Sequence, residues 1–436
     1  MSKLPLEGIR VLSITVSFAG PWGSMMLGDL GAEVIRVESI QHFPATTRAL
    51  MLKVPASAMR PGSYYHRLYA DSEAGSRHWD RFAYFTRFAR NQLSCCIDLD
   101  RPQGTDVFRR LVQVSDVFYE NNAVGVMEKL GITYPTLKQW NPRIIYLSNP
   151  GFGNSGPYKN FLGFGVNMEA LTGHTWLRGY SDSDHPMHNT GVYHMDASAG
   201  AAGVFAVLIA LHYRNRTGKG LYMDMAGAET VIPHFGEAIM DYTMNQRVQR
   251  TLGNRDIHSA APSGCYRCRG EPDEWVCITI SSDEEWRTFC RVIGSPPWTS
   301  DERFADSMGR LRHHDELDKL IEEWTGRHDK YEVMVILQQA GVPAGPVIGD
   351  KDAHRDPQLI SRHFFEVVNH RETGVHIYPG FLWKYSKMPM SVRQPPVCLG
   401  EHNEYVFRDI LHLDDREKAD LEAKQIIGGD VYVDYK

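Results

Sequence analysis

The chain has 436 residues, enough for two or three domains, and its 42% hydrophobic and 23% charged residues are typical of a soluble globular protein. Its net charge of −6 disfavours binding to nucleic-acid phosphates. The most apolar stretch, residues 201–211, has about half the length of a bilayer-spanning helix, and the N-terminus lacks a secretory-signal pattern, so we expect a cytoplasmic protein.

The first forty residues predict a strand, a helix and a second strand. Residues 9–14 are apolar, Ala19-Gly20-Pro21 signals a turn, residues 22–30 carry a helical pattern closed by Gly31, and residues 34–37 form another strand. The pattern continues with a helix over 102–114 and with strands over 94–99, 116–119 and 143–147. This βαβ arrangement predicts an open, Rossmann-like α/β domain with a parallel sheet covered by helices.

Residues 40–90 form a long segment rich in Pro, Arg and aromatic residues. A stretch of this length without regular structure is typical of an active-site lid or a partner-binding arm. Disorder is the alternative, but the aromatic residues argue against it.

The second half of the chain predicts a smaller domain. A strong helix covers 196–214, strands follow between 264 and 280, and charged helices cover 284–292, 314–324, 330–340 and, near the end, 414–425. Cys265 and Cys268 form a lone CxxC without the second pair that a zinc site needs. We interpret them as two cysteines of a β-strand over 264–269.

Three further features point only weakly to a site. Gly20-Pro21-x-Gly23 lies between a strand and a helix but lacks the complete GxGxxG pattern of a dinucleotide site. The Gly-rich run over 151–158 would allow close approach of a ligand, although a structural loop is the simpler interpretation. His185, His188 and His194 lie close together without the regular spacing that favours a metal site.

Asp196 precedes seven small residues, 197–203, at a predicted helix start. The helix macrodipole and the free amides there stabilise an ionised carboxylate. An N-cap is the simplest interpretation. The alternative is a nucleophile for covalent catalysis, since small residues would leave space above the carboxylate.

Several motifs along the chain together resemble the class III coenzyme A (CoA) transferases, the family of formyl-CoA transferase, carnitine CoA-transferase and α-methylacyl-CoA racemase. Each motif alone is unspecific, but the set spans nearly the whole chain in the family's order. The set consists of Leu6-x-Gly8-Ile9-Arg10-Val11-Leu12, Ala19-Gly20-Pro21, Leu30-Gly31-Ala32-Glu33-Val34-Ile35-x-Val37-Glu38, Asp116-Val117-x-x-Glu120-Asn121, Asn141-Pro142-Arg143-Ile144-Ile145-Tyr146, Gly151-Phe152-Gly153-x-x-Gly156-Pro157-Tyr158, Arg216-Thr217-Gly218-Lys219-Gly220, Gly341-Val342-Pro343-Ala344-Gly345-Pro346-Val347 and Leu399-Gly400-Glu401-His402.

The resemblance implies a fold and a nucleophile. Asp196 stands at the family's nucleophile position, a short distance before its RxTGxG motif, which reverses the preference for an N-cap. The implied fold is a large open α/β domain built from both chain ends, a smaller α+β domain and an interlocked homodimer. Residues 1–225 and 351–436 would form the large domain, and residues 226–350 would form linker helices and the smaller domain.

Positions that hold CoA in the family can also be carried over. The matching residues are Val16, Ser17, Phe18, Ala19, Ile97, Asp98, Leu99, Asn121, Asn122 and Lys129. Ser39 replaces a basic residue that is common in the family, so Arg36, Arg90 or Arg101 is expected to hold one CoA phosphate instead.

The implied reaction moves CoA from a donor acyl-CoA to an acceptor acid, without a metal. Asp196 would carry first a mixed anhydride and then a CoA thioester. Backbone amides near Phe18-Ala19 and Asp196-Ala197 are candidates for stabilising the oxyanions. Aromatic and apolar residues in 40–90 and 161–174 predict an acceptor larger than formate or oxalate, such as an aromatic or branched (di)carboxylic acid, for example an arylsuccinate, with succinyl-CoA as donor. An Arg of the first segment could pair with a second carboxylate.

Three alternatives remain open. Racemases of the family place a His-Asp pair after the Gly-rich loop, and the matching Phe164 and Gly165 cannot move a proton, which favours a transferase. A structural subunit of a hetero-oligomeric transferase is the second alternative, although the retained Asp196 argues against it. A dinucleotide-dependent dehydrogenase is the third, and its glycine motif is broken.

Overall fold

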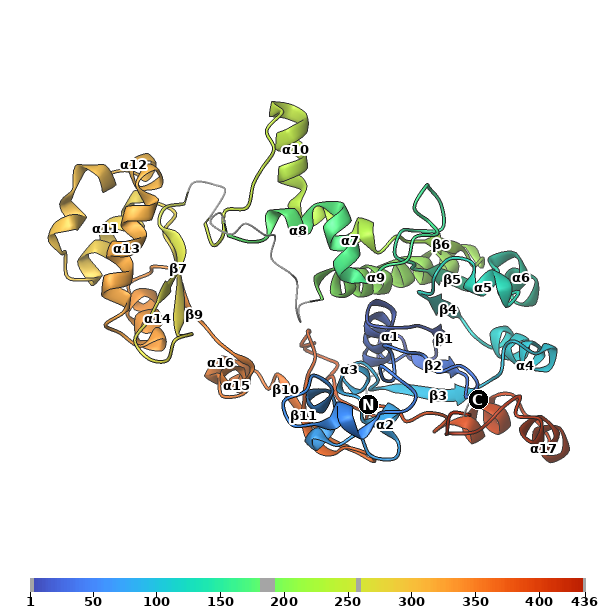
Figure 1. The fold of residues 1–436 in the computed structure, drawn as a ribbon. Helices are drawn as coiled ribbons and strands as arrows, with labels where there is room; N and C mark the ends of the chain where they lie inside the picture. Colours follow the sequence, from blue (N-terminus) through green and yellow to red (C-terminus); the bar gives the residue numbers. More distant parts are fainter. Residues whose placement is uncertain (1–3, 181–192, 256–259, 434–436) are drawn as a thin grey trace. The chain divides into compact units, whose positions relative to one another are not determined.

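The computed structural model describes residues 4–180, 193–255 and 260–433 (Figure 1). The chain folds into two compact units. Unit 1 contains Met1–His174, Asn189–Gly236 and Arg362–Lys436, and unit 2 contains Thr175–His188 and Glu237–Ser361.

A six-stranded parallel sheet forms the centre of unit 1. Its strands are β1 (Arg10–Ile14), β2 (Glu33–Glu38), β3 (Gln92–Cys96), β4 (Val117–Glu120), β5 (Ile145–Ser148) and β6 (Tyr222–Asp224), in the order β3-β2-β1-β4-β5-β6. The strand order reverses between β1 and β4, where Leu12 faces both Ile35 and Phe118. The predicted open parallel sheet is therefore confirmed, and ligands of such sheets bind outside the carboxyl ends of the strands at this reversal.

Successive residues of the strands alternate between two apolar layers. Val11, Val34 and Leu147 pack under α1 (Ala19–Asp29) and α9 (His194–Thr217), whereas their neighbours face the other layer, with α4 (Pro102–Gln113), α6 (Tyr134–Trp140) and α17 (Asp415–Ala423). Figure 1 shows β1–β6 between these two sets of helices. Short helices α5 (Val126–Lys129), α7 (Gly165–Thr172) and α8 (His174–Leu177) lie between these elements in the sequence.

Residues 40–90 are ordered, which excludes the alternative of disorder. They form short 3-10 helices (Ala56–Met59, Tyr65–Leu68 and Ala70–Ser72) and the single turns α2 (His78–Arg81) and α3 (Ala83–Thr86). Leu68, Tyr69, Phe82 and Phe85 form a small apolar core of their own. Next to this core, the fully buried Arg48 holds Glu38 at 2.6 Å and Asp80 at 2.8 Å, which ties the segment to the carboxyl end of β2.

The C-terminal part of the chain returns to unit 1. It contains the hairpin β10 (Phe365–His370) and β11 (Gly374–Pro379), a π-helical turn over Tyr405–Ile410, and α17. Figure 1 places the hairpin beside α2, and an ion pair of 3.6 Å between Arg77 and Glu372 joins the two. Unit 1 is thus assembled from both ends of the chain.

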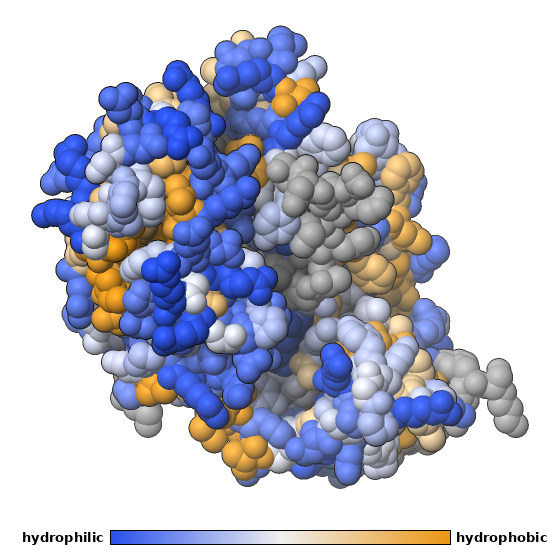
Figure 2. All heavy atoms as spheres, turned by 60° about the vertical axis from the view of Figure 1, so that its left-hand side comes forward, coloured by the Kyte–Doolittle hydropathy of each residue, from blue (hydrophilic) through white to orange (hydrophobic). Residues whose placement is uncertain are grey.

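Unit 2 contains a three-stranded antiparallel sheet and several helices. The strands are β7 (Ser263–Arg267), β8 (Trp275–Thr279) and β9 (Ala344–Val347), and the helices are α10 (Gly236–Asn245), α11 (Asp283–Val292), α12 (Ser307–Arg312), α13 (His314–Thr325), α14 (Lys330–Gln339), α15 (Asp350–Ala353) and α16 (Pro357–Ser361). The sheet shares its apolar core with α11, α13 and α14, whereas α10, α15 and α16 have no buried residues. The face seen in Figure 2 is mostly hydrophilic, as expected of helices with charged outer sides.

The two cysteines of the CxxC motif do not lie together on one strand. β7 ends at Arg267, so Cys268 lies beyond the strand, which corrects the prediction that both cysteines share it. Cys265 instead faces Cys277 across β7 and β8, with 2.7 Å between the sulfurs. The predicted strand ran two residues too far, because nothing in the local sequence marks the end at Arg267, and the partner of Cys265 lies across the strands rather than along one of them.

Candidate active site

A cavity of about 390 Å³ lies in unit 1 at the carboxyl ends of β1, β4 and β5. Asp196 lines it, together with Gly151 of the Gly-rich loop and Phe164 and Gly165 at the start of α7. The remaining lining includes apolar and aromatic side chains of four segments: Phe18, Leu50, Tyr64, Tyr84, Phe161, Leu162 and Tyr193. The cavity therefore lies at the point of strand-order reversal, where the fold predicts a ligand.

Asp196 is buried in the first turn of α9. The helix begins at His194 with Tyr193 as N-cap, so Asp196 is not the capping residue that its sequence position suggested. Its side chain accepts a hydrogen bond from the backbone N–H of Ala19, the first residue of α1. The pKa of Asp196 is raised to about 6, chiefly by burial and also by the Glu169 carboxylate, whereas the Ala19 N–H and the Arg87 guanidinium oppose the rise.

The small residues after Asp196 serve helix packing rather than leaving space. A methyl group on Gly200 would lie 2.9 Å from the Ala19 carbonyl oxygen and 3.1 Å from Trp22 Cβ, and one on Gly23 would lie 3.1 Å from the Gly200 carbonyl oxygen. The helices α1 and α9 can approach this closely only because both glycines lack a side chain. Their approach brings the Ala19 N–H to the Asp196 carboxylate.

Glycine at position 165 keeps the other side of the carboxylate open. A methyl group on Gly165 would lie 2.6 Å from Asp196 Oδ2, closer than van der Waals contact allows. On the buried face of α7, Glu169 holds the neighbouring backbone by accepting from the Met195 N–H at 2.9 Å. The carboxylate of Asp196 thus sits between α1, α7 and α9.

A second cavity, of about 360 Å³, lies beside the ends of β1, β2, β3 and β4. Val16 and Asn122 line both cavities. Of the residues expected to contact CoA, Val16, Ile97, Leu99, Asn122 and Lys129 line the second cavity, and Val16, Ser17, Phe18, Ala19, Asn121 and Asn122 line the Asp196 cavity. Asp98 lines neither, because its buried carboxylate holds Arg101 and the Asp100 N–H.

The two backbone N–H groups near Asp196 donate to different acceptors. The Ala197 N–H donates to the Tyr193 carbonyl oxygen at 3.0 Å within the first turn of α9, so it is not available as an oxyanion donor in this conformation. The Ala19 N–H, by contrast, points at the Asp196 side chain. Of the two predicted donor positions, only that at the start of α1 faces the carboxylate.

Comparison with known proteins identifies the chain. The family model described as CoA-transferase family III matches residues 6–403. This chain belongs to CoA-transferase family III. A succinyl-CoA–D-citramalate CoA-transferase of Chloroflexus aurantiacus is 30% identical over 423 residues, which cover 97% of this chain and 98% of that protein.

Two further family members extend the comparison. A probable CoA-transferase of Mycobacterium tuberculosis is 30% identical over 435 residues, and the chain spans 50% of that longer protein. The crystal structure of a CaiB/BaiF family protein from Brucella suis has a TM-score of 0.77 at 28% identity, covering 94% of this chain and all (100%) of that one. The family assignment made from the motifs is therefore confirmed.

The three arginines expected to hold a CoA phosphate differ in their position relative to the two cavities. Arg36 lines the second cavity, buried, with Nη2 donating to the Thr15 carbonyl oxygen at 3.2 Å. Arg90 is buried against Asp29, at 2.8 Å, and does not line either cavity. Arg101 is held by Asp98, so among the three arginines considered for a CoA phosphate only Arg36 lies at the cavity.

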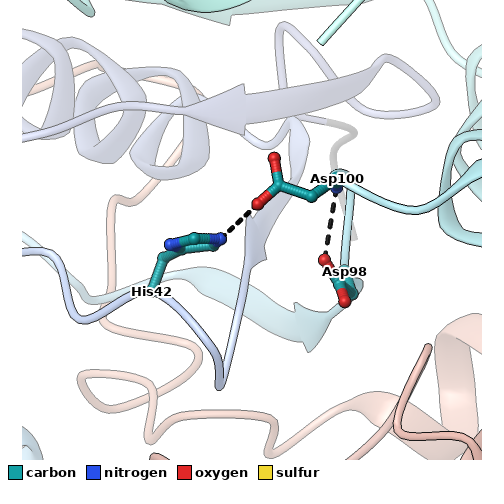
Figure 3. Close-up of side chains that lie close together, drawn as sticks. All are labelled: His42, Asp98 and Asp100. Atoms are coloured by element: carbon teal, nitrogen blue, oxygen red, sulfur yellow. Dashed lines mark hydrogen bonds and ion pairs between the residues drawn. The ribbon is translucent and has the colours of Figure 1, made fainter. Parts of the chain in front are cut away.

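His42 is a cavity residue that the motifs did not reveal. It lines the second cavity and lies 2.5 Å from Asp100, as Figure 3 shows. His42, Asp98 and Asp100 bring one ligand atom each within 4.8 Å of one another, but Asp98 is already bound by Arg101. His42 belongs to the Pro-rich segment and lies far from Asp100 in the sequence, so the sequence gives no indication that the two side chains are in contact.

The predicted histidine group is only partly described. His185 and His188 lie outside the described residues. His194, the first residue of α9, lies 2.7 Å from His234, measured between ring nitrogens, and its ring stacks on that of His174. This arrangement shows a histidine contact next to Asp196 that the spacing of the three predicted residues did not suggest.

Proposed function

We propose that the chain transfers CoA from succinyl-CoA to a second carboxylic acid through covalent intermediates on Asp196. The observation that carries the proposal is the position of this carboxylate, which lies in a cavity of a family III chain and accepts a hydrogen bond from Ala19. With a pKa of about 6, Asp196 is ionised at neutral pH and competent as a nucleophile.

The first half of the reaction loads the enzyme. An Asp196 oxygen attacks the thioester carbon, the C–S bond breaks, and CoA leaves as a thiolate, so that an acyl-aspartyl anhydride remains. The thiolate then attacks the aspartyl carbonyl carbon and releases the donor acid as a carboxylate. Asp196 is left as a CoA thioester, and no net proton is consumed.

The second half reverses these steps with the acceptor. The acceptor carboxylate attacks the aspartyl thioester and releases CoA thiolate, which attacks the acceptor carbonyl of the new anhydride and regenerates Asp196. Each attack on the aspartyl carbon places negative charge on an Asp196 oxygen. The Ala19 N–H, which donates to this side chain in the structure, is the donor we assign to that oxyanion.

We assign the second cavity to the CoA nucleotide and pantetheine. Apolar side chains such as Ile97, Leu99 and Met127 line it, with Arg36 and Lys129 as cations for phosphate. Val16 and Asn122, which line both cavities, mark the path along which the pantetheine thiol would reach Asp196. CoA is thereby a substrate, and the proposed steps need no metal.

For the acceptor we propose an aromatic or branched dicarboxylic acid, such as an arylsuccinate. The aromatic lining of the Asp196 cavity supports an acceptor larger than oxalate, and the related C. aurantiacus enzyme is named for D-citramalate. The racemase alternative is not favoured, because Phe164 and Gly165 offer no acid or base beside Asp196.

Trapping the intermediate is the direct test. We expect that purified chain incubated with succinyl-CoA and then hydroxylamine carries a hydroxamate on the peptide containing Asp196, as mass spectrometry would detect. The same treatment of an Asp224→Asn variant should leave the modification in place, because Asp224 lies at the end of β6 and binds Asn154. Modification of another carboxylate would refute the assignment of Asp196. Absence of any adduct with the chain alone would favour the structural-subunit alternative.

We further propose a cytoplasmic homodimer in which a second copy covers the outer side of α9. This helix of 24 residues has the length and apolarity of a membrane span, but half of its apolar window is buried. Its outer side exposes Phe205 (66%), Ile209 (53%) and Tyr213 (45%). Apolar exposure on one side of a core helix is what an obligate interface uses.

Light scattering tests this interface. We expect the wild-type chain to be a dimer and Phe205→Glu to shift it towards monomer, because a buried charge would have no partner in the interface. Thr217→Glu, at the exposed end of the same helix, should not change the mass. A monomeric wild-type chain with full activity would contradict the proposal.

A further inference from the structure

One arginine and four aromatic rings form a cluster beside Asp196. The guanidinium carbon of Arg87 lies between 4.3 and 5.3 Å from the ring centroids of Phe88, Phe18, Tyr84 and Tyr193. Three of these rings, those of Phe18, Tyr84 and Tyr193, also line the Asp196 cavity. The ring faces stabilise the cation in part, but they do not accept its N–H groups as a carboxylate does.

Two nitrogens of Arg87 have no acceptor within the part of the chain that the structure describes. Both Nε and Nη2 are buried and unpartnered. Together they form one edge of the planar guanidinium, and the parallel N–H groups of such an edge match the two oxygens of a carboxylate. Because an unfilled bidentate edge on a buried cation is costly, a carboxylate supplied by a ligand is the natural partner.

Three phenol hydroxyls interact electrostatically with the Arg87 guanidinium and are joined to one another by hydrogen bonds. Tyr64 Oη lies 3.0 Å from Tyr84 Oη, and a side-chain hydrogen bond joins Tyr84 to Tyr193. All three tyrosines line the cavity that contains Asp196. Burial raises the pKa of Tyr64 to about 12 and raises that of Tyr193 as well, so their hydroxyls remain protonated donors.

We propose that Arg87, with the hydroxyls of Tyr64, Tyr84 and Tyr193, binds the second carboxylate of dicarboxylic substrates while their first carboxyl group reacts at Asp196. The inference rests on the proposed CoA transfer and identifies the substrate class as dicarboxylic acids and their CoA thioesters. Since Nε and Nη2 of Arg87 are buried, binding of the carboxylate includes a movement that opens this edge to the Asp196 cavity.

Succinyl-CoA and butyryl-CoA test this directly, because they differ only in a terminal carboxylate against a methyl group. The quantity to compare is measured in a single turnover. It is the rate constant for forming the CoA thioester on Asp196, divided by the acyl-CoA concentration that gives half of the maximal rate. We expect Arg87→Met to lower this value about 100-fold more for succinyl-CoA than for butyryl-CoA, as for loss of a bidentate charged pair. Arg87→Lys keeps the positive charge but lacks the two parallel N–H groups. We expect it to lower the value for succinyl-CoA about 10-fold more than that for butyryl-CoA.

Two comparisons make the outcome decisive. Arg60→Met changes an exposed arginine of the same segment and should leave both thioesters unaffected. Tyr84→Phe, which removes only a hydroxyl, should lower the succinyl-CoA value several-fold and that of butyryl-CoA less. Equal losses for both thioesters in Arg87→Met and Arg87→Lys, or no loss in either, would overturn the assignment of Arg87. A wild-type chain that forms no adduct with either thioester would instead refute the proposed CoA transfer itself.

Discussion

Replacement of Asp196 by asparagine is expected to abolish CoA transfer and, at neutral pH, to stabilise the fold. The amide cannot form the anhydride, so we expect a loss of at least about 10³-fold in kcat. The raised pKa of about 6 means that the buried carboxylate is costly when ionised. Removing the charge should therefore increase the free energy of unfolding by about 3 kcal/mol at pH 7.5.

The pH dependence of this gain separates it from other effects of the substitution. The folded-state pKa of Asp196 lies above the unfolded value, so protonation favours the folded chain, and this stability is lost as the pH rises through about 6. Urea unfolding of both chains should give free energies of unfolding that coincide near pH 4, diverge between about pH 4 and pH 6, and stay apart by a constant amount above pH 7. An Asp196→Asn chain that is no more stable at pH 7.5 would show that the carboxylate is not buried as described.

Replacement of Gly165 by alanine is expected to lower kcat about 100-fold with little effect on stability. The added methyl group would lie 2.6 Å from Asp196 Oδ2, so the carboxylate must turn away from the Ala19 N–H. A displacement of about 1 Å of a nucleophile has an effect of this size. The rest of α7 has no reason to move, because alanine favours a helix more than glycine does.

Gly236→Ala provides the matched control for this substitution. Gly236 is the first residue of α10, as Gly165 is of α7, and a methyl group there meets nothing within 4 Å. Steady-state kinetics of both variants with succinyl-CoA would separate a local effect at the nucleophile from a general effect of removing a helix-initial glycine. Full activity of Gly165→Ala would contradict the proposed tight placement of the carboxylate.

These substitutions act on two sides of one carboxylate. Ala19 contacts it from the start of α1, and Gly165 leaves room for it from the start of α7. α1 follows β1 at the point of strand-order reversal, where parallel α/β folds place their ligands, and α7 follows the neighbouring strand β5. The proposed chemistry therefore depends on helix packing that is set by glycines rather than on a catalytic dyad.

Much of the fold could be predicted from the sequence because its signals are local. The strand at 10–14 lies in a short apolar run typical of a buried parallel strand, and the helix at 102–113 follows the apolar period of 3.6 residues. Gly31 closes the first helix in the left-handed conformation with φ of +103°. The helix α9 begins at His194, two residues before the start that the sequence predicts at Asp196, since His194 and Met195 carry no helix-start signal. Residues 40–90 show no apolar periodicity in the sequence, because their structure is held by tertiary contacts such as those of Arg48 with Glu38 and Asp80.

By itself the sequence determined the family and the parallel sheet, and it proposed Asp196 as the nucleophile, because motifs and apolar patterns are properties of neighbouring residues. Only the tertiary structure decided what surrounds that carboxylate. The Ala19 N–H, the open face at Gly165 and the unfilled edge of Arg87 are contributed by segments far apart in the chain. Their convergence depends on side-chain packing between α1, α7, α9 and residues 40–90, which no spacing along one segment encodes.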